Sequence, residues 1–151
     1  MASSRIGLWL IGARGGVAST VVTGLVALRH RLIPPIGLTT ELPDFKNLDM
    51  PDWADFVVGG HEIRDVRLFD EAMDLATRSR AIDADLLRRL ETDLDAIDRR
   101  IRPGTLLGVG STIAGLAGDA MGIPGDESPR EAIARIQEDL RDFAAAERLE
   151  H

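Results

Sequence analysis

The sequence predicts an α/β fold: a mainly parallel sheet flanked by helices, of the Rossmann-like kind. An apolar run at residues 5–11 stops at Gly12, which is typical of a strand buried on both faces. Apolar residues then recur at helical spacing from Val17 to about His30. Strand and helix signals continue to alternate along the 151 residues, a length that suits one domain with its own core.

Two more short strands are expected after the first helix. Residues 34–35 are both proline and end the helix, and the mostly apolar residues 36–39 then predict a second strand. Residues 41–53 contain two further prolines and little periodicity, which indicates a long ordered loop. Residues 56–58 predict a third strand, which we expect the glycines at positions 59–60 to close.

Helical patterns dominate the second half of the chain. Apolar spacing predicts one helix around residues 69–76 and another from Asp83, its expected N-cap, to Ile101. The proline and glycine at positions 103–104 would stop the second helix, and residues 105–109 predict a fourth strand. The acidic residues of both helices are spaced like solvated faces.

The last predicted element is a helix over residues 129–146. It begins at a capping box, residues 128–131, with proline at the first helical position. The final three residues, 149–151, resemble the first residues of a vector-derived histidine tag. We therefore expect a domain of residues 1–148 followed by a tag remnant.

Composition excludes several classes of function. Eighteen basic residues stand against 25 acidic ones, and the net charge of −7 disfavours nucleic acid as a partner. The absence of cysteine removes disulfides, thiol nucleophiles and thiolate metal sites. No apolar run approaches the roughly 20 residues that span a bilayer, and no leader is recognisable. We expect no membrane partner and a cytoplasmic location.

One motif carries chemistry: the glycine-rich loop between the first strand and the first helix. Gly12 permits a tight bend, Gly15 lets the backbone approach a pyrophosphate, and Ala18 is small enough for close helix–strand packing. The phosphates would lie at the helix N-terminus, where unpaired N–H groups and the helix dipole favour negative charge. Ser19 and Thr20 add hydroxyls there. The alternative is a glycine loop that only joins a strand to a helix.

Two choices stay open from the residues alone. Arg14 is a solvated loop residue, a residue against the adenine, or a partner for the 2′-phosphate of NADP. A carboxylate on the ribose hydroxyls would instead favour NAD, and the candidates are Glu41 after the second strand and Glu62 after the third. His61 has no second histidine or cysteine nearby, so we predict no metal site.

Several segments together resemble a known family. Trp9–Thr20, Ile36–Pro43 and Gly59–Arg64 occur in this order and spacing, and Ile123–Gly125 and Ile136–Phe143 fit as well. They resemble the N-terminal part of the myo-inositol-1-phosphate synthase (inositol-3-phosphate synthase) family, especially its shorter archaeal and bacterial branch. The resemblance covers nearly the whole chain.

The resemblance implies a cofactor and a reaction. Family members are isomerases that convert D-glucose 6-phosphate to 1D-myo-inositol 3-phosphate, using NAD to oxidise the sugar before ring closure and to reduce it afterwards. The family's catalytic lysines and its tetramer-forming sheet belong to the second half of its chain, and its Rossmann-like domain is split. The resemblance therefore implies an incomplete, N-terminal part of the NAD-binding domain, inactive alone and forming a homo-oligomer. Lys46, the single lysine, matches no catalytic position.

The resemblance also implies site residues. It decides for Glu62 rather than Glu41 as the ribose carboxylate, and it assigns no catalytic residue to this chain. The expected cofactor-binding residues are Gly12, Arg14, Gly15, Gly16, Val17, Glu62, Gly110 and Ser111. Two alternatives remain: a paralogous NAD(P)-dependent oxidoreductase or isomerase of the same fold, and a stand-alone nucleotide-binding regulatory module.

Overall fold

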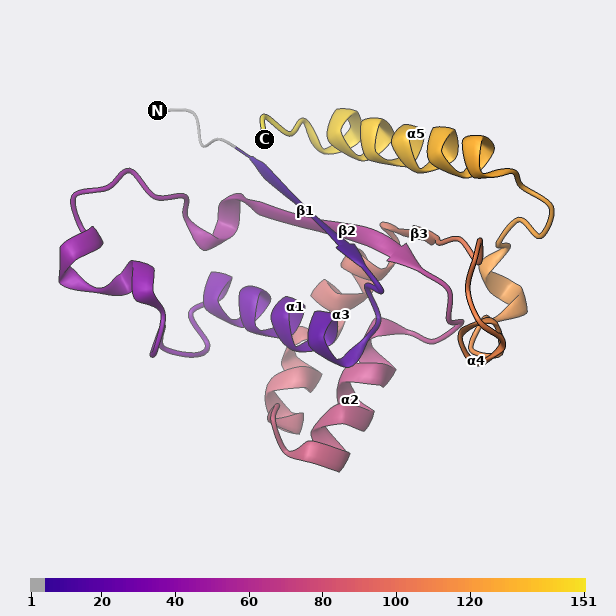
Figure 1. Ribbon diagram of the computed structural model, residues 1–151. Helices are drawn as coiled ribbons and strands as arrows, with labels where there is room; N and C mark the ends of the chain where they lie inside the picture. Colours follow the sequence, from indigo (N-terminus) through magenta and orange to yellow (C-terminus); the bar gives the residue numbers. More distant parts are fainter. Residues whose placement is uncertain (1–4) are drawn as a thin grey trace.

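A parallel sheet in the order β1-β2-β3 forms the middle layer of the computed structural model (Figure 1). Helices α1, α2 and α3 cover one face of this sheet, and α5 lies across the other. The strands are β1 (Ile6–Ile11), β2 (Phe56–Glu62) and β3 (Ile101–Pro103). The helices are α1 (Gly16–Arg29), α2 (Leu68–Ser79), α3 (Ala84–Asp98), α4 (Ser111–Ala114) and α5 (Pro129–Glu147). The predicted fold class is confirmed.

The structure describes residues 5–151, so the first four residues of the expected domain lie outside it. In that part of the chain no helix is both long and apolar enough to cross a membrane.

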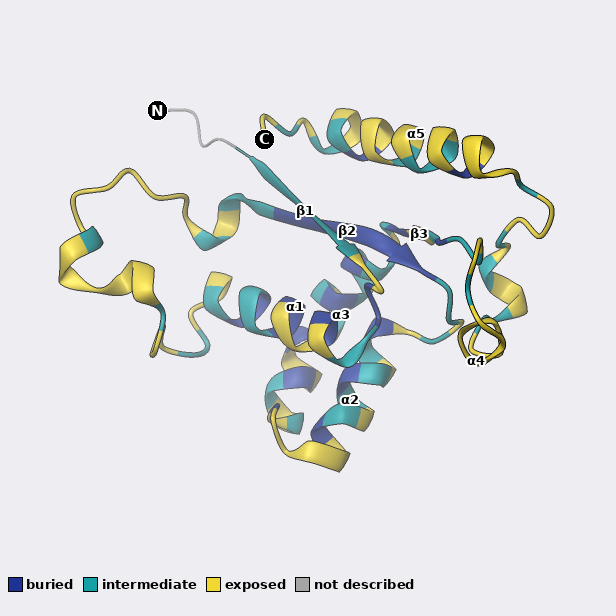
Figure 2. Ribbon diagram, viewed as in Figure 1, coloured by how far each residue is buried: buried dark blue, intermediate teal, exposed yellow. Residues whose placement is uncertain are grey.

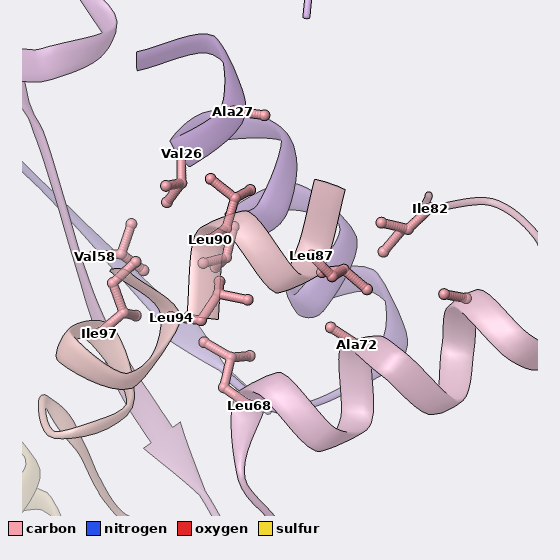
Figure 3. Packing of buried hydrophobic residues seen from close by; sticks show 12 residues of the cluster. Val26, Ala27, Val58, Leu68, Ala72, Ile82, Leu87, Leu90, Leu94 and Ile97 are labelled. Atoms are coloured by element: carbon pink, nitrogen blue, oxygen red, sulfur yellow. The ribbon is translucent and has the colours of Figure 1, made fainter. Parts of the chain in front are cut away.

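The hydrophobic core lies between the sheet and helices α1, α2 and α3 (Figure 3). Leu87, Leu90 and Leu94 recur at helical spacing along α3 and are almost completely buried against Val26 of α1 and Leu68 of α2. Burying each of these side chains stabilises the fold by about 1.5–3 kcal/mol. Figure 2 shows the same asymmetry: the middle of the molecule is buried, whereas the long loop before β2 is exposed.

The predicted strand at residues 36–39 is wrong. Gly37 has a positive φ of 81°, Ile36 is 84% exposed, and short 3-10 turns follow at Thr39–Glu41 and Pro43–Phe45. The chain between α1 and β2 runs outside the sheet (Figure 1), in agreement with the predicted long loop. Four largely apolar residues cannot form a strand without a partner, and both edges of β1 are occupied, one by β2 and the other by the last residues of the chain.

The glycines expected to close the third strand lie inside it. β2 pairs with β1 from Phe56 opposite Ile6 through His61 opposite Ile11. A Cβ on Gly59 would lie 2.8 Å from the Trp9 ring, and one on Gly60 would overlap the carbonyl oxygen of Leu10. Glycine inside a strand marks a close approach of neighbouring groups, and here it permits packing on both faces.

The end of α3 and the following strand also differ from prediction. The helix ends at Asp98, and Ile101 begins β3 instead of completing the helix. Residues 101–103 pair with the last three residues of β2, where that strand ends. The predicted strand at 105–109 is therefore wrong, because the chain has already passed the end of its partner.

Helix α5 begins at the predicted capping box, in which the Ser128 and Glu131 side chains accept each other's backbone N–H groups. It packs on the sheet through Phe143, whose ring centroid lies 5.0 Å from that of Trp9. Beyond the helix, Glu150 N–H donates to the Arg5 carbonyl, and Gly7 N–H donates to the His151 carbonyl. Residues 149–151 thus lie along the second edge of β1, and their assignment as a tag remnant stays a prediction.

We expect Gly60→Ala to lower the free energy of unfolding by about 1–3 kcal/mol, because the added methyl group must displace backbone of the neighbouring strand. Urea unfolding of the two proteins measures the difference. Gly125→Ala is the matched control, since nothing lies within 4 Å of a Cβ at that position. Equal midpoints for both variants would contradict the role given to Gly60.

Candidate functional site

A largely apolar cleft of about 500 Å³ lies at the carboxyl ends of the strands. In open α/β sheets ligands bind outside this edge, where the loops that follow the strands meet. The wall includes residues from the ends of β1 and β2 and from the segment around α4, among them Ile11, Gly12, Gly15, Glu62, Ile113 and Leu116. The glycine loop and the expected ribose carboxylate therefore face the same space.

The conformation of the glycine loop depends on its glycines. Gly12 has φ of 77°, in the left-handed region that favours glycine, and Gly15 N–H donates to the Gly12 carbonyl at 2.8 Å. A Cβ on Gly15 would lie 3.1 Å from that carbonyl oxygen. The N–H groups of Gly12 and Ala13 both donate to the His61 carbonyl of β2, which holds the loop against the sheet.

The N-terminus of α1 can receive an anion. The N–H groups of its first residues have no partner inside the helix, and no side chain caps them. Gly16 begins the helix and Val17 is 82% exposed, so the backbone at both expected positions can be approached. The hydroxyls expected to help do not: the Ser19 side chain is fully buried, and Thr20 donates to the Gly16 carbonyl.

Glu62 is the last residue of β2, and its carboxylate is a hub for backbone N–H groups. Oε2 accepts from Arg14 at 2.9 Å, and Oε1 accepts from Ile63 at 2.8 Å and from Arg64 at 3.1 Å. A carboxylate offers about four acceptor positions, so one remains on Oε2. Glu41, the other candidate, is exposed in the loop before β2 and does not follow a strand.

The surroundings of Glu62 favour its charged form. Burial by itself would raise the pKa of this carboxyl, but the N–H donors of Ile63, Arg14 and Arg64, with the Arg64 guanidinium, outweigh it. The net result is a pKa below the ordinary value of 4.5. The Glu62 carboxylate is therefore ionised beside the glycine loop, with Nη2 of Arg64 3.6 Å from its Oε2.

Arg14 is not a solvated loop residue. It is 8% exposed, and its side chain turns inward, where Nε donates to Asp98 at 2.8 Å. Nη1 donates to the Arg64 carbonyl at 3.1 Å and to the Met121 sulfur at 2.9 Å. The guanidinium is thus occupied by internal partners.

Two residues of this network escaped the sequence analysis. Arg64 donates back to the Arg14 carbonyl and lies 3.3 Å from Glu71. Asp98, grouped by its spacing with solvated acids, has a side chain only 18% exposed and binds Arg14. Arg64 belongs to the quoted segment Gly59–Arg64 and could have been noticed there; no local signal marks Asp98.

Gly110 and Ser111 are not brought to the cleft wall. Gly110 caps the short helix α4, and both residues are exposed; residues 105–109 before them form no strand, and their role at the cofactor stays a prediction. Ile113 and Leu116 line the cleft from the same segment.

Both ring nitrogens of His61 have partners within the fold. Its Nδ1 accepts from the Trp9 indole N–H at 3.0 Å, and its Nε2 lies 2.9 Å from Asp139 of α5. Since the indole can only donate, the proton of the neutral ring belongs on Nε2. Among residues 5–151 no group of three or more acidic, histidine or cysteine side chains could hold a metal ion.

This arrangement defines a nucleotide-binding domain of the Rossmann-like class. A family model described as Myo-inositol-1-phosphate synthase, for an NAD-binding domain, matches residues 6–151. The chain therefore belongs to the myo-inositol-1-phosphate synthase family, as its NAD-binding domain. It is 26% identical over 160 residues to Inositol-3-phosphate synthase 1 of Bacteroides thetaiotaomicron, a match that covers 99% of this chain. The chain spans 35% of the length of that relative.

We expect Glu62→Gln to destabilise the fold at pH 7 by about 1–3 kcal/mol, because an amide leaves at least one buried N–H without an acceptor. A carboxyl with a lowered pKa contributes stability above its ordinary value, and this contribution is lost as pH falls through the folded-state pKa. The difference between the two proteins should therefore be constant above pH 4.5 and shrink below it.

Urea unfolding at a series of pH values from 7 down to 3 measures this difference. Glu41→Gln, at an exposed position in the loop, is the control and should follow the unsubstituted chain at every pH. A Glu62→Gln penalty that is unchanged at low pH would contradict the depressed pKa.

Proposed function

We propose that this chain supplies the NAD site of an enzyme that converts D-glucose 6-phosphate into 1D-myo-inositol 3-phosphate. The observation that carries the proposal is the shared cleft, which the glycine loop enters from β1 and the Glu62 carboxylate from β2. The name of the Bacteroides thetaiotaomicron relative, Inositol-3-phosphate synthase 1, supports the reaction.

The chain's residues divide the task of holding the cofactor. Gly12, Gly15 and Gly16, with the backbone at Val17, would receive the pyrophosphate at the N-terminus of α1, where N–H groups are unpaired. The remaining acceptor position on Glu62 would bind a ribose hydroxyl. When bound, NAD supplies the oxidation and reduction of the sugar, and the apolar wall at Ile113 and Leu116 excludes water from one side of the cleft.

Catalysis of ring closure needs groups that the described cleft does not present. Polarising a carbonyl and moving protons requires a positioned cation and a base. Lys46, the chain's single lysine, is exposed in the loop before β2 and does not line the cleft. The Arg14 and Arg64 guanidinium groups are bound to carboxylates and backbone carbonyls. We infer that the catalytic residues come from the part of the relatives that this chain does not span.

Self-association is the expected partner interaction. Away from the cleft wall, Ile36, Leu48 and Ile133 are large apolar side chains that are more than half exposed, and apolar surface of this kind is stabilised when other protein covers it. We infer that copies of the chain associate through such surfaces. The cytoplasmic location expected from the sequence stays a prediction.

We expect Gly15→Val to abolish NAD binding, because a branched side chain would press on the Gly12 carbonyl and occupy the space of the pyrophosphate. Calorimetric titration of the chain with NAD measures the effect, and the thermal unfolding midpoint confirms that the variant is folded. Gly125→Val, in open surroundings, is the control. A folded Gly15→Val chain with unchanged affinity would contradict the loop assignment.

We expect the purified 151-residue chain to form no inositol phosphate from glucose 6-phosphate and NAD, because no lysine lines its cleft. Phosphate-ester analysis of the reaction mixture by NMR is the measurement. Detection of the product, at a rate that Gly15→Val abolishes, would show that the chain contains a complete catalytic site.

A further inference from the structure

The side chain of Arg14 is an unusual feature for a phosphate-binding loop. A cation next to such a loop would be expected to face the anion, yet this guanidinium points away from the cleft. It forms an ion pair with Asp98, 2.8 Å away, while its side chain is only 9% exposed. Its backbone N–H meanwhile donates to Glu62.

Asp98 connects this ion pair to the helical layer. It is the last residue of α3, and its Oδ1 accepts both the Arg14 Nε–H and the backbone N–H of Leu68, the first residue of α2. Leu68 itself is fully buried in the core. Movement of the loop at Arg14 would therefore disturb the junction of two packed helices.

A second set of bonds fixes the loop from the side of β2. Arg14 and Arg64 each donate from the guanidinium to the other's backbone carbonyl. The Glu62 carboxylate accepts the backbone N–H groups of both. Both polar groups of the Arg14 backbone are thereby used, one residue before Gly15.

Stability alone explains such an arrangement poorly. A buried ion pair must repay the desolvation of both charges, and well-packed apolar residues often stabilise as much. What the polar arrangement adds is a defined orientation of the loop, because each hydrogen bond is strong only over a narrow range of angles.

The partners of the two guanidinium groups also matter for the nucleotide. Arg14 is paired with Asp98, and Arg64 lies between Glu62 and Glu71. An additional phosphate on the ribose would meet the Glu62 carboxylate, while the Arg14 and Arg64 guanidinium groups are held by these internal partners.

We infer that Arg14 and Asp98 are a positioning pair: their internal ion pair orients the glycine loop for the pyrophosphate and withholds the guanidinium from the nucleotide. Glu62 is then left to select NAD over NADP. This inference rests on the proposed function of the loop as the pyrophosphate site.

The test is calorimetric titration with NAD and with NADP of the chain and its Asp98→Asn and Arg14→Met variants, singly and combined. Asp85→Asn is the matched control, since Asp85 lies on the same helix with a side chain that is 88% exposed. We expect Asp98→Asn to weaken NAD binding about tenfold or more, because a loop displaced by a fraction of an ångström loses its aligned N–H groups. Asp85→Asn should change nothing.

Two further results are expected. The double variant should bind NAD no more weakly than either single variant, because both remove the same interaction. The affinity for NADP relative to NAD should rise in Asp98→Asn, which releases the Arg14 guanidinium, and not in the double variant, which lacks it.

Other outcomes overturn the inference. Unchanged NAD affinity in folded Asp98→Asn, together with a loss in Arg14→Met, would mean that Arg14 touches the nucleotide directly. Additive losses in the double variant would show that the two residues act separately. If Asp98→Asn does not fold, Arg14→Met decides: it removes the ion pair but leaves Asp98 in place to accept from Leu68, so full NAD affinity in folded Arg14→Met would refute the inference.

The proposed function fails separately. If the chain does not bind NAD, or if a folded Gly15→Val chain binds it with full affinity, both the pyrophosphate site and this inference are refuted. If Gly15→Val loses NAD affinity and Asp98→Asn keeps it, the pyrophosphate site stands and only the positioning pair is refuted.

Discussion

The parallel pairing of β2 with β1 is the interaction on which the rest of the structure depends. It places the His61 carbonyl where it accepts from Gly12 and Ala13, and the Glu62 carboxylate where it accepts from Arg14. Residues separated by about 50 positions in the chain thus become one site. The loop after β1 would otherwise have buried N–H groups without acceptors, each at a cost of about 1–3 kcal/mol.

The cleft contains two different electrostatic environments, and a dinucleotide needs both. Unpaired N–H groups at the N-terminus of α1 favour the negative charge of a pyrophosphate, whereas the ionised Glu62 favours neutral hydroxyl donors. Both are built largely from backbone and from buried groups, so little has to be reorganised on binding. This preorganisation agrees with the chain's membership of a family whose domain binds NAD.

Contacts on the face of the sheet opposite the core also fix the position of β2. The Trp9 ring lies against Gly59, and its indole N–H donates to His61, which in turn contacts Asp139 of α5. A side chain at Gly59 would separate the Trp9 ring from the sheet. The same glycine pair therefore permits close packing of α5 on one face and of the loop on the other, and it keeps Glu62 in position.

The sequence by itself determined the elements whose signals are local: the first strand, the helix after the glycine loop, and the N-caps and apolar stripes of the later helices. It also located the loop and, through a family resemblance, Glu62. Tertiary structure alone decided which short apolar segments became strands, since residues 36–39 lack a partner and 101–103 have one. It alone paired Arg14 with Asp98, because an ion pair across 84 positions leaves no periodicity, cap or turn that a local pattern could reveal.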